Sequence, residues 1–318
     1  LKPVGGKKTV GEVVDELLKS KLLRFERGDL RKTSIDDFRI RARRFSEVFE
    51  KVPIIELQVE QIKDWLLGLG GGPRTTQNYL SFATEIMNHA VQSRYLVKSP
   101  LDYLTTNERK ELCGNGAGKK EPSILTVEEA RRLIQTAYEN PKLNLLPAVV
   151  LGLFCGIRTE EIKRLDWSQV KDHESQPIVT ISSSIAKKRR IRHVDIPENA
   201  RLWLSTSLDR NGTVTFSSIN NDYQRRFRTL LKLAGFGRKD DEGVWRSRWD
   251  ANAMRHSFGS YHFALFGDSL ETSRQLGHRA SDQVLFDHYR ALATKEQAEC
   301  YFAIKPEKVE SKIVRIAG

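Results

Sequence analysis

Three short segments in the last quarter of the chain combine residue types that suit chemistry on a phosphodiester. They are Asn252-Ala253-Met254-Arg255-His256, Leu276-Gly277-His278 and Asp287-His288-Tyr289-Arg290. A guanidinium such as that of Arg255 can pair with two phosphate oxygens, and an imidazole such as that of His278 can donate a further hydrogen bond. The hydroxyl of Tyr289 can attack phosphorus as it loses its proton.

The segment around Arg255 is expected to be a helix that holds this side chain in place. Its apolar residues recur at three- and four-residue steps, namely Met254, Phe258, Tyr261, His262 and Leu265. Such a pattern buries one face of a helix. We therefore expect the guanidinium of Arg255 to be fixed rather than mobile in solvent.

A second arginine follows a run that is apolar on most sides, from about residue 145 to 154. The chain continues as Gly156-Ile157-Arg158-Thr159-Glu160-Glu161-Ile162. Glycine permits a tight turn after a buried helix, and Glu161 is placed to brace the guanidinium of Arg158. Alone, Arg-x-x-Glu is a common surface pair, so the surrounding sequence carries this prediction.

A basic hairpin is expected between these two arginine segments. Residues 178–182 and 192–197 are typical of strands, and they are joined by Ala186-Lys187-Lys188-Arg189-Arg190. A further helix, 223–233, presents Arg225 on its polar side. We expect Lys188, Arg189, Arg190 and Arg225 to contact the phosphates of a polyanionic partner.

Taken in order, these segments resemble those of the tyrosine recombinase (phage integrase) family, over roughly residues 9–304. That family has an arginine box, a basic β-hairpin, a His-x-x-Arg box, Leu-Gly-His and then a nucleophilic tyrosine. Two departures are visible: Asn252 stands where the family usually has histidine, and Tyr289 follows His278 slightly later than is commonest in the family.

The resemblance assigns catalytic roles to six residues. They are Arg158, Lys187, Asn252, Arg255, His278 and Tyr289. Lys187 would protonate the leaving 5′ oxygen, although the register leaves Lys188 as a rival, and Tyr301 is a rival nucleophile. Because Asn252 cannot accept a proton as histidine does, we expect a slower or more tightly regulated enzyme.

The N-terminal part, residues 1–101, is expected to be a four-helix domain. Apolar stripes begin near residues 10, 34, 59 and 74, and Thr9 is a predicted N-cap. The order resembles the SAM-like core-binding domain of the family. Arg74, Thr75 and Gln77, which open the fourth helix, are the DNA contacts expected here.

Residues 102–122 are poor in large apolar side chains and rich in glycine and charge, which predicts a linker. Its lysines, Lys119 and Lys120, are expected to face phosphate. The run does not match Gly-x-x-x-x-Gly-Lys-Ser/Thr, and no strand precedes it, so a nucleotide-binding loop is excluded. The catalytic domain would occupy residues 123–318.

Composition agrees with a polyanionic partner. The 318 residues include 53 Lys+Arg against 41 Asp+Glu, giving a formal charge of +12. The three cysteines are far apart, so neither a zinc site nor a disulfide framework is expected. No apolar run reaches the roughly 18 to 20 residues of a membrane span, and we expect a cytoplasmic protein associated with a bacterial or archaeal nucleoid. The sequence begins at Leu1 rather than at methionine, which is compatible with an upstream segment such as an arm-binding domain.

These observations predict a mainly α fold with a small β-sheet or hairpin: a helical core-binding domain followed by a mixed α+β catalytic domain. The expected function is site-specific recombination of double-stranded DNA, without cofactor or metal, by a chain that forms a homo-tetramer in the synapse and for which a monomer is an open alternative in free solution. Two alternatives stay open: a relaxing enzyme similar to type IB topoisomerases, and a sequence-specific DNA-binding protein that has lost cleavage.

Overall fold

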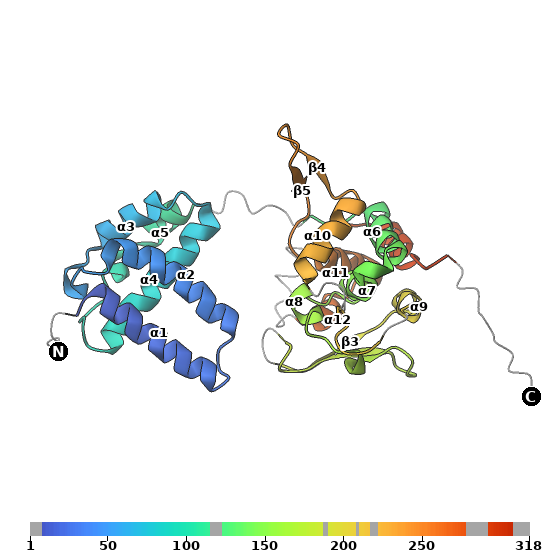
Figure 1. The fold of residues 1–318 in the computed structure, drawn as a ribbon, viewed down its shortest axis with the longest axis horizontal. Helices are drawn as coiled ribbons and strands as arrows, with labels where there is room; N and C mark the ends of the chain where they lie inside the picture. Colours follow the sequence, from blue (N-terminus) through green and yellow to red (C-terminus); the bar gives the residue numbers. More distant parts are fainter. Residues whose placement is uncertain are drawn as a thin grey trace, which may run out of the picture. The chain divides into compact units, whose positions relative to one another are not determined.

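The structure, a computed structural model, describes residues 8–114, 123–186, 190–207, 210–216, 222–277 and 292–307. The chain forms two compact units, Leu1–Lys119 and Lys120–Gly318, which are coloured along the sequence in Figure 1. Among the described residues, no helix is both long enough and apolar enough to span a bilayer.

Among its described residues, the first unit folds as five helices. They are α1 (Val10–Glu26), α2 (Lys32–Phe49), α3 (Val59–Gly68), α4 (Pro73–Gln92) and α5 (Thr106–Cys113), with 3₁₀ turns at Ile54–Glu56 and Pro100–Tyr103. The predicted apolar stripes form the core, where Phe45, Phe82 and Ile86 are each at most 3% exposed. The predicted cap at Thr9 is also present, since its side chain accepts from the amide of Glu12.

The linker predicted over residues 102–122 is wrong in its first half, and the first unit has a fifth helix that was not expected. Helix α5 is capped by Thr105, and it packs against α3 and α4. Lys63 of α3 pairs with Glu108 at 2.6 Å. No residue of α5 is fully buried, so the helix lacks the apolar stripe by which sequence analysis finds helices.

The second unit is organised around α7 (Leu146–Phe154), all of whose residues are buried. This is the helix predicted from the apolar run at 145–154. Its neighbours are α6 (Val127–Glu139), α9 (Glu198–Ser205) and α11 (Ala253–Phe266). The other described helices are α8 (Thr159–Ile162), α10 (Tyr223–Leu233), α12 (Ser269–Leu276) and α14 (Lys295–Phe302), with 3₁₀ turns at Pro141–Leu143 and Trp167–Gln169.

A three-stranded antiparallel sheet lies beside these helices, in the order β1 (Val170–Lys171), β2 (Ile178–Ile181), β3 (Arg192–Asp195). Val179 is paired with Val194, and both are fully buried. The predicted strand pair is therefore present, although each strand is shorter than expected. Together with the helices, the sheet confirms the predicted fold class.

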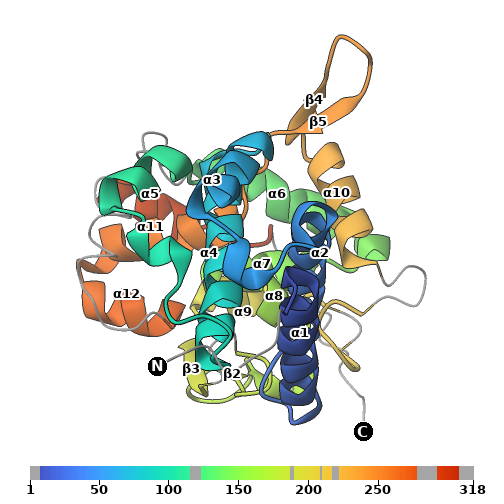
Figure 2. The same ribbon diagram turned by 90° about the vertical axis from the view of Figure 1, so that its left-hand side faces the viewer.

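A second hairpin, β4 (Gly237–Lys239) and β5 (Trp245–Ser247), was not predicted. It stands away from the helices of the second unit in both directions of view (Figures 1 and 2). Its acidic turn is held locally, because Asp240 accepts from the amide of Val244 at 2.8 Å and pairs with Arg246 at 2.7 Å. Strands of three residues are too short to give a period-two pattern in the sequence.

Candidate active site

The turn after α7 delivers Arg158 to the site. Gly156 has φ +61°, and a Cβ atom added there would lie 2.3 Å from Cδ1 of Phe258 and 2.9 Å from Cδ2 of Leu276. Both the backbone conformation and the lack of space therefore require glycine. The turn is closed by the amide of Ile157, which donates to the carbonyl of Leu151 at 3.2 Å.

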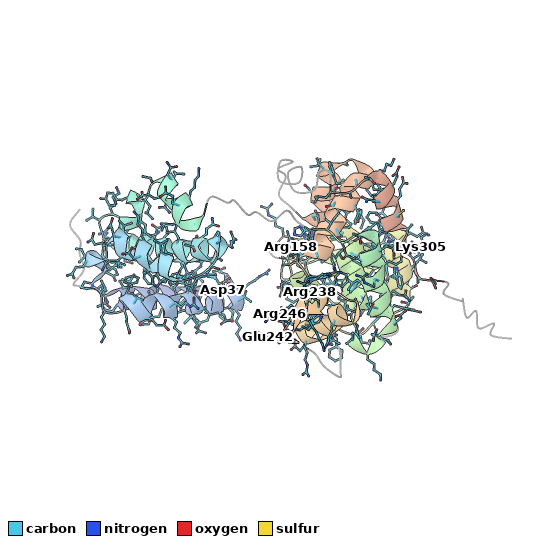
Figure 3. All side chains as sticks on the ribbon, turned by 90° about the horizontal axis from the view of Figure 1, so that it is seen from above. Asp37, Arg158, Arg238, Glu242, Arg246 and Lys305 are labelled. Atoms are coloured by element: carbon cyan, nitrogen blue, oxygen red, sulfur yellow. The ribbon has the colours of Figure 1, made fainter. Side chains whose placement is uncertain are left out.

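Arg158 stands at the N-terminus of α8, where its carbonyl accepts from the amides of Glu161 and Ile162. Its side chain, labelled in Figure 3, is 20% exposed, and its Nη1 atom lies 3.5 Å from Oε1 of Glu161. Glu161 is only 1% exposed. The predicted brace is thus present, and it is a buried carboxylate, which must be paired to be tolerated in the interior.

The main partner of Glu161 is Arg192, which sequence analysis did not single out. Nη1 and Nη2 of Arg192 donate to Oε1 and Oε2 of Glu161 at 3.2 and 2.7 Å. This two-bond geometry is the strongest arrangement for an arginine and a carboxylate. The two residues are 31 positions apart and meet only because β3 returns beside α8, so no local sequence signal could have identified the pair.

Arg255 connects two turns of the site. It lies in the first turn of α11 and is 5% exposed. Nη1 donates to the carbonyl of Gly156 at 2.6 Å, and Nη2 donates to the carbonyl of Leu276 at 2.5 Å. The predicted fixed guanidinium is present, and it ties the turn that carries Arg158 to the turn that leads to residue 278.

The second of these turns is built around Gly277, which has φ +62° at the end of α12. A Cβ atom added there would lie 2.7 Å from Cδ and 2.8 Å from Nε of Arg192. The guanidinium of Arg192 therefore packs directly against the backbone of Gly277. Three segments distant in the sequence meet at Arg192 and Arg255.

Asn252 immediately precedes α11 and has a left-handed backbone conformation, with φ 65° and ψ 17°. Asparagine and histidine are among the few residues other than glycine that accept this conformation readily. The side chain is exposed and makes no capping hydrogen bond to the helix. The side chain is accessible to solvent at the N-terminal end of α11, the end that also carries Arg255.

The electrostatic balance of the described site is positive. The side chains of Arg158, Arg192 and Arg255 carry three positive charges, and Glu161 carries one negative charge, leaving a net charge of +2. Among the described residues, no group of three or more His, Cys, Asp or Glu could hold a metal ion. The arrangement provides cationic hydrogen-bond donors, which suits the binding of an anion.

Several predicted residues lie outside the described part of the chain. They are Lys119, Lys120, Lys187, Lys188, Arg189, His278 and Tyr289. The structure gives the segments on either side of them, such as Leu276–Gly277 and β2–β3. The roles of these residues stay predictions.

The other predicted DNA contacts are accessible. Arg74 and Gln77 are exposed in the first turns of α4, where Nη1 of Arg74 donates to Oε1 of Gln77 at 3.1 Å, and Thr75 between them is half-buried. Arg190, just before β3, and Arg225, in the first turn of α10, are exposed. All five are thus accessible to a ligand at least in part.

Tyr301, the rival nucleophile, is a core residue. Its side chain is fully buried, its hydroxyl donates to the carbonyl of Leu153 at 2.7 Å, and its ring stacks on that of Tyr261 at 4.1 Å between centroids. Burial raises the pKa of the Tyr301 hydroxyl well above its ordinary value. A hydroxyl in this state cannot reach a phosphodiester.

Comparison with known proteins gives a family match and a shared fold. A family model described as the phage integrase family matches residues 123–296. The Tn1549 transposon integrase in complex with transposon right end DNA has a TM-score of 0.67 at 17% identity, and the match covers 92% of this chain and 98% of that chain. No curated protein matches the sequence.

Two structures of lambda integrase are similar to the same degree. A fragment that forms a dimer bound to a COC′ core site has a TM-score of 0.65 at 16% identity, covering 87% of this chain and 97% of that chain. A tetramer bound to a Holliday junction has a TM-score of 0.65 at 14% identity, covering 86% of this chain and 78% of that chain. At these identities the likeness establishes the fold.

Proposed function

Because the chain belongs to the phage integrase family, we propose that it is a site-specific DNA recombinase that cleaves and rejoins DNA strands through a 3′-phosphotyrosyl intermediate. The observation that carries this proposal is the pair of arginines held near one another. Arg255 donates to the carbonyl of Gly156, two residues before Arg158. Two fixed guanidinium groups on adjacent turns are suited to the two non-bridging oxygens of one phosphodiester.

In the proposed reaction, the oxygen of Tyr289 bonds to phosphorus and the bond from phosphorus to the 5′ oxygen breaks. Negative charge accumulates on the non-bridging oxygens of the transition state, and Arg158, Arg255 and His278 would stabilise it. By analogy with oxyanion donors, removal of one such group should slow cleavage on the order of a hundredfold or more.

Protons must move at both ends of the reaction. Lys187, with Lys188 as its rival, would give a proton to the leaving 5′ oxygen, and a lysine in a cationic site can have its pKa lowered enough to do so. The proton of Tyr289 would pass to His278 or to water, because the side chain of Asn252 is not a base. The phosphotyrosyl bond keeps the energy of the cleaved bond, so another strand's 5′ hydroxyl can reverse the step without ATP or metal.

The partners follow from this chemistry. We propose double-stranded DNA with a specific recombination site as the substrate, and a homo-tetramer as the form that joins two such sites. Lambda integrase has been solved as a tetramer bound to a Holliday junction. The enzyme would act in the cytoplasm of the bacterial or archaeal host of a mobile element.

One observation favours a second candidate, a DNA-binding protein that has lost cleavage. Asn252 occupies the position where the family usually has histidine, and its exposed side chain cannot take a proton. Site-specific binding without any covalent product would support this candidate over the recombinase.

Covalent trapping tests the proposal. A random duplex library with nicks near candidate cleavage points would be incubated with wild type, Tyr289→Phe and Tyr301→Phe, then resolved on a denaturing gel and sequenced. We expect an adduct with wild type and Tyr301→Phe and none with Tyr289→Phe. Tight binding of selected sequences with no adduct in any variant would contradict the recombinase and favour the binding protein.

A further inference from the structure

The contacts of Glu161 are unequal. Both of its carboxylate oxygens accept from Arg192, at 3.2 and 2.7 Å, while Arg158 approaches only Oε1, at 3.5 Å. The latter distance is at the outer limit of a hydrogen bond. Of these two described partners, Arg192 is therefore the one that binds the carboxylate more closely.

A buried carboxylate that loses its partner attracts another cation, because an uncompensated charge in the interior is strongly unfavourable. Glu161 is 1% exposed, and the side chain of Arg192 is 13% exposed. If Arg192 were absent, the described cation next to Glu161 would be Arg158. Glu161 would then draw the guanidinium of Arg158 closer than the present 3.5 Å and change its orientation.

Arg192 also supports the turn before residue 278. The guanidinium packs against Gly277 so closely that no Cβ atom fits there. Gly277 follows Leu276, whose carbonyl accepts from Arg255. One guanidinium thus fixes the carboxylate that orients Arg158 and covers the turn to which Arg255 is bound.

We infer that Arg192 is a positioning residue of the strand-cleavage reaction, which holds the guanidinium of Arg158 in the orientation that meets the scissile phosphate by occupying Glu161. This inference rests on the proposed function. In it, Arg192 acts through Glu161 and Gly277.

Binding to a charged or neutral linkage gives a direct test. The probes are two duplexes of the sequence recovered by covalent trapping, one with a normal phosphodiester at the cleaved position and one with a methylphosphonate, which has no charge there. Affinities would be measured for Tyr289→Phe, which cannot cleave, and for the same protein carrying Arg192→Gln. We expect Tyr289→Phe to bind the charged duplex more tightly than the neutral one. Adding Arg192→Gln should reduce the ratio of these two affinities by about tenfold.

Arg210 provides a matched control. Its Nη1 and Nη2 donate to Oδ1 and Oδ2 of Asp172 at 2.9 and 2.9 Å, and the side chain of Asp172 is 1% exposed. Arg210→Gln removes a guanidinium from a buried carboxylate in the same unit, so it should lower the free energy of unfolding about as much as Arg192→Gln does. It should leave the preference for the charged duplex intact.

Cleavage rates complete the test. In single turnover, at a temperature where every variant is folded, Arg192→Gln should cleave on the order of ten to a hundred times more slowly than wild type, and Arg210→Gln should match wild type. Adding Glu161→Gln to Arg192→Gln should restore part of the preference for the charged duplex, because the carboxylate that captures Arg158 is gone. If Arg192→Gln does not fold, Arg192→Lys, which cannot bind both oxygens in parallel, replaces it.

The outcomes are distinct. An unchanged preference in Arg192→Gln, or an equal loss in Arg210→Gln, would overturn the inference while leaving the recombinase intact. If wild type forms no adduct on the normal duplex, the proposed function itself fails, and the inference fails with it.

Discussion

Asn252 shows how one residue can serve both the backbone and the chemistry. Its φ of 65° is unfavourable for most side chains by about 1 kcal/mol or more, and its side chain is exposed at the end of α11 that carries Arg255. Glycine accepts this conformation without a side chain, alanine does not accept it, and histidine accepts it and adds a base. Three substitutions can therefore separate the two roles.

We predict that Asn252→His raises the cleavage rate, because a base then stands where the family usually has one. Asn252→Ala should lower the free energy of unfolding by about 1 kcal/mol, whereas Asn252→Gly should change it less. Adduct formation and thermal unfolding of the three variants would be compared. A cleavage rate in Asn252→His that is equal to or lower than that of wild type would count against the assignment.

Tyr301 and Tyr289 should give opposite results when each is changed to phenylalanine. Tyr301→Phe removes a buried hydrogen bond to the carbonyl of Leu153, so we expect a loss of stability of about 1 to 2 kcal/mol and normal cleavage chemistry. Tyr289→Phe should keep wild-type stability and form no adduct. Urea unfolding and the trapping gel would be run on both variants, and loss of the adduct in Tyr301→Phe at full folding would contradict this distinction.

His262 is a buried titratable residue whose effect on stability can be given a sign. Thr272 donates its hydroxyl to the carbonyl of Asp268, so it accepts from the Nδ1–H of His262 at 2.8 Å. Burial lowers the pKa of His262 to about 4. Between this value and the ordinary value of about 6.5, the unfolded chain binds the proton and the folded chain does not.

Stability should therefore fall as the pH drops from about 6.5 towards 4. The contribution of His262 is up to about 3 kcal/mol, since one pKa unit corresponds to about 1.4 kcal/mol. We predict that His262→Gln flattens the pH dependence of the free energy of unfolding in this window. Urea unfolding of both proteins at pH 4.5 and pH 7 would measure it, and two parallel pH profiles would refute the prediction.

At the scale of elements, the turn between α7 and α8 is the feature on which the site depends most. We predict that Gly156→Ala lowers the free energy of unfolding by more than about 2 kcal/mol, because the backbone strain adds to the overlap with Phe258 and Leu276. Cleavage should also be lost, since the turn carries Arg158.

Gly235 is the control for Gly156. It has a similar φ of +72°, and a Cβ atom added there meets nothing within 4 Å. Gly235→Ala should therefore show the backbone strain alone, about 1 kcal/mol, with normal cleavage. Thermal unfolding of the two variants would be compared, and equal losses would show that packing around Gly156 is not the cause.

The elements that sequence analysis predicted well have strong local signals. The all-apolar run of α7, the N-cap at Thr9 and the stripes of α1, α2 and α4 depend on neighbouring residues alone. Two of the elements it missed, α5 and the β4–β5 hairpin, are short, and none of their residues is fully buried, so they leave little periodic pattern. The same holds for the residues of the site. Arg158 and Arg255 could be predicted from their local sequence, whereas the pairing of Glu161 with Arg192 depends on the fold, which brings β3 beside α8.

At the scale of the whole molecule, the net charge of +12 makes any binding to DNA depend on salt. Each neutralised phosphate contributes about 0.9 to the slope of log affinity against log salt concentration. We predict that Arg74→Gln lowers the magnitude of this slope by up to about 1, and that it does so for all sequences, because a phosphate contact carries no sequence information.

Lys8→Gln is a suitable control for the salt measurement. Nζ of Lys8 lies 3.3 Å from Oε1 of Glu12 and 3.2 Å from Oε1 of Glu16. Its charge is therefore already compensated within the first unit. Fluorescence anisotropy over a range of salt concentrations would give both slopes. An Arg74→Gln slope equal to that of wild type would exclude a phosphate contact at this position.

The position of Arg255 has a consequence for how such a protein could lose its activity during evolution. A change at Arg255 would leave the carbonyls of Gly156 and Leu276 without their donor and would be removed by selection for a folded chain, whatever the state of the enzyme. A change at an accessible nucleophile would remove the reaction alone. Descendants that had become binding proteins would therefore still carry Arg255, and loss of the accessible nucleophile is the change that would distinguish them from active relatives.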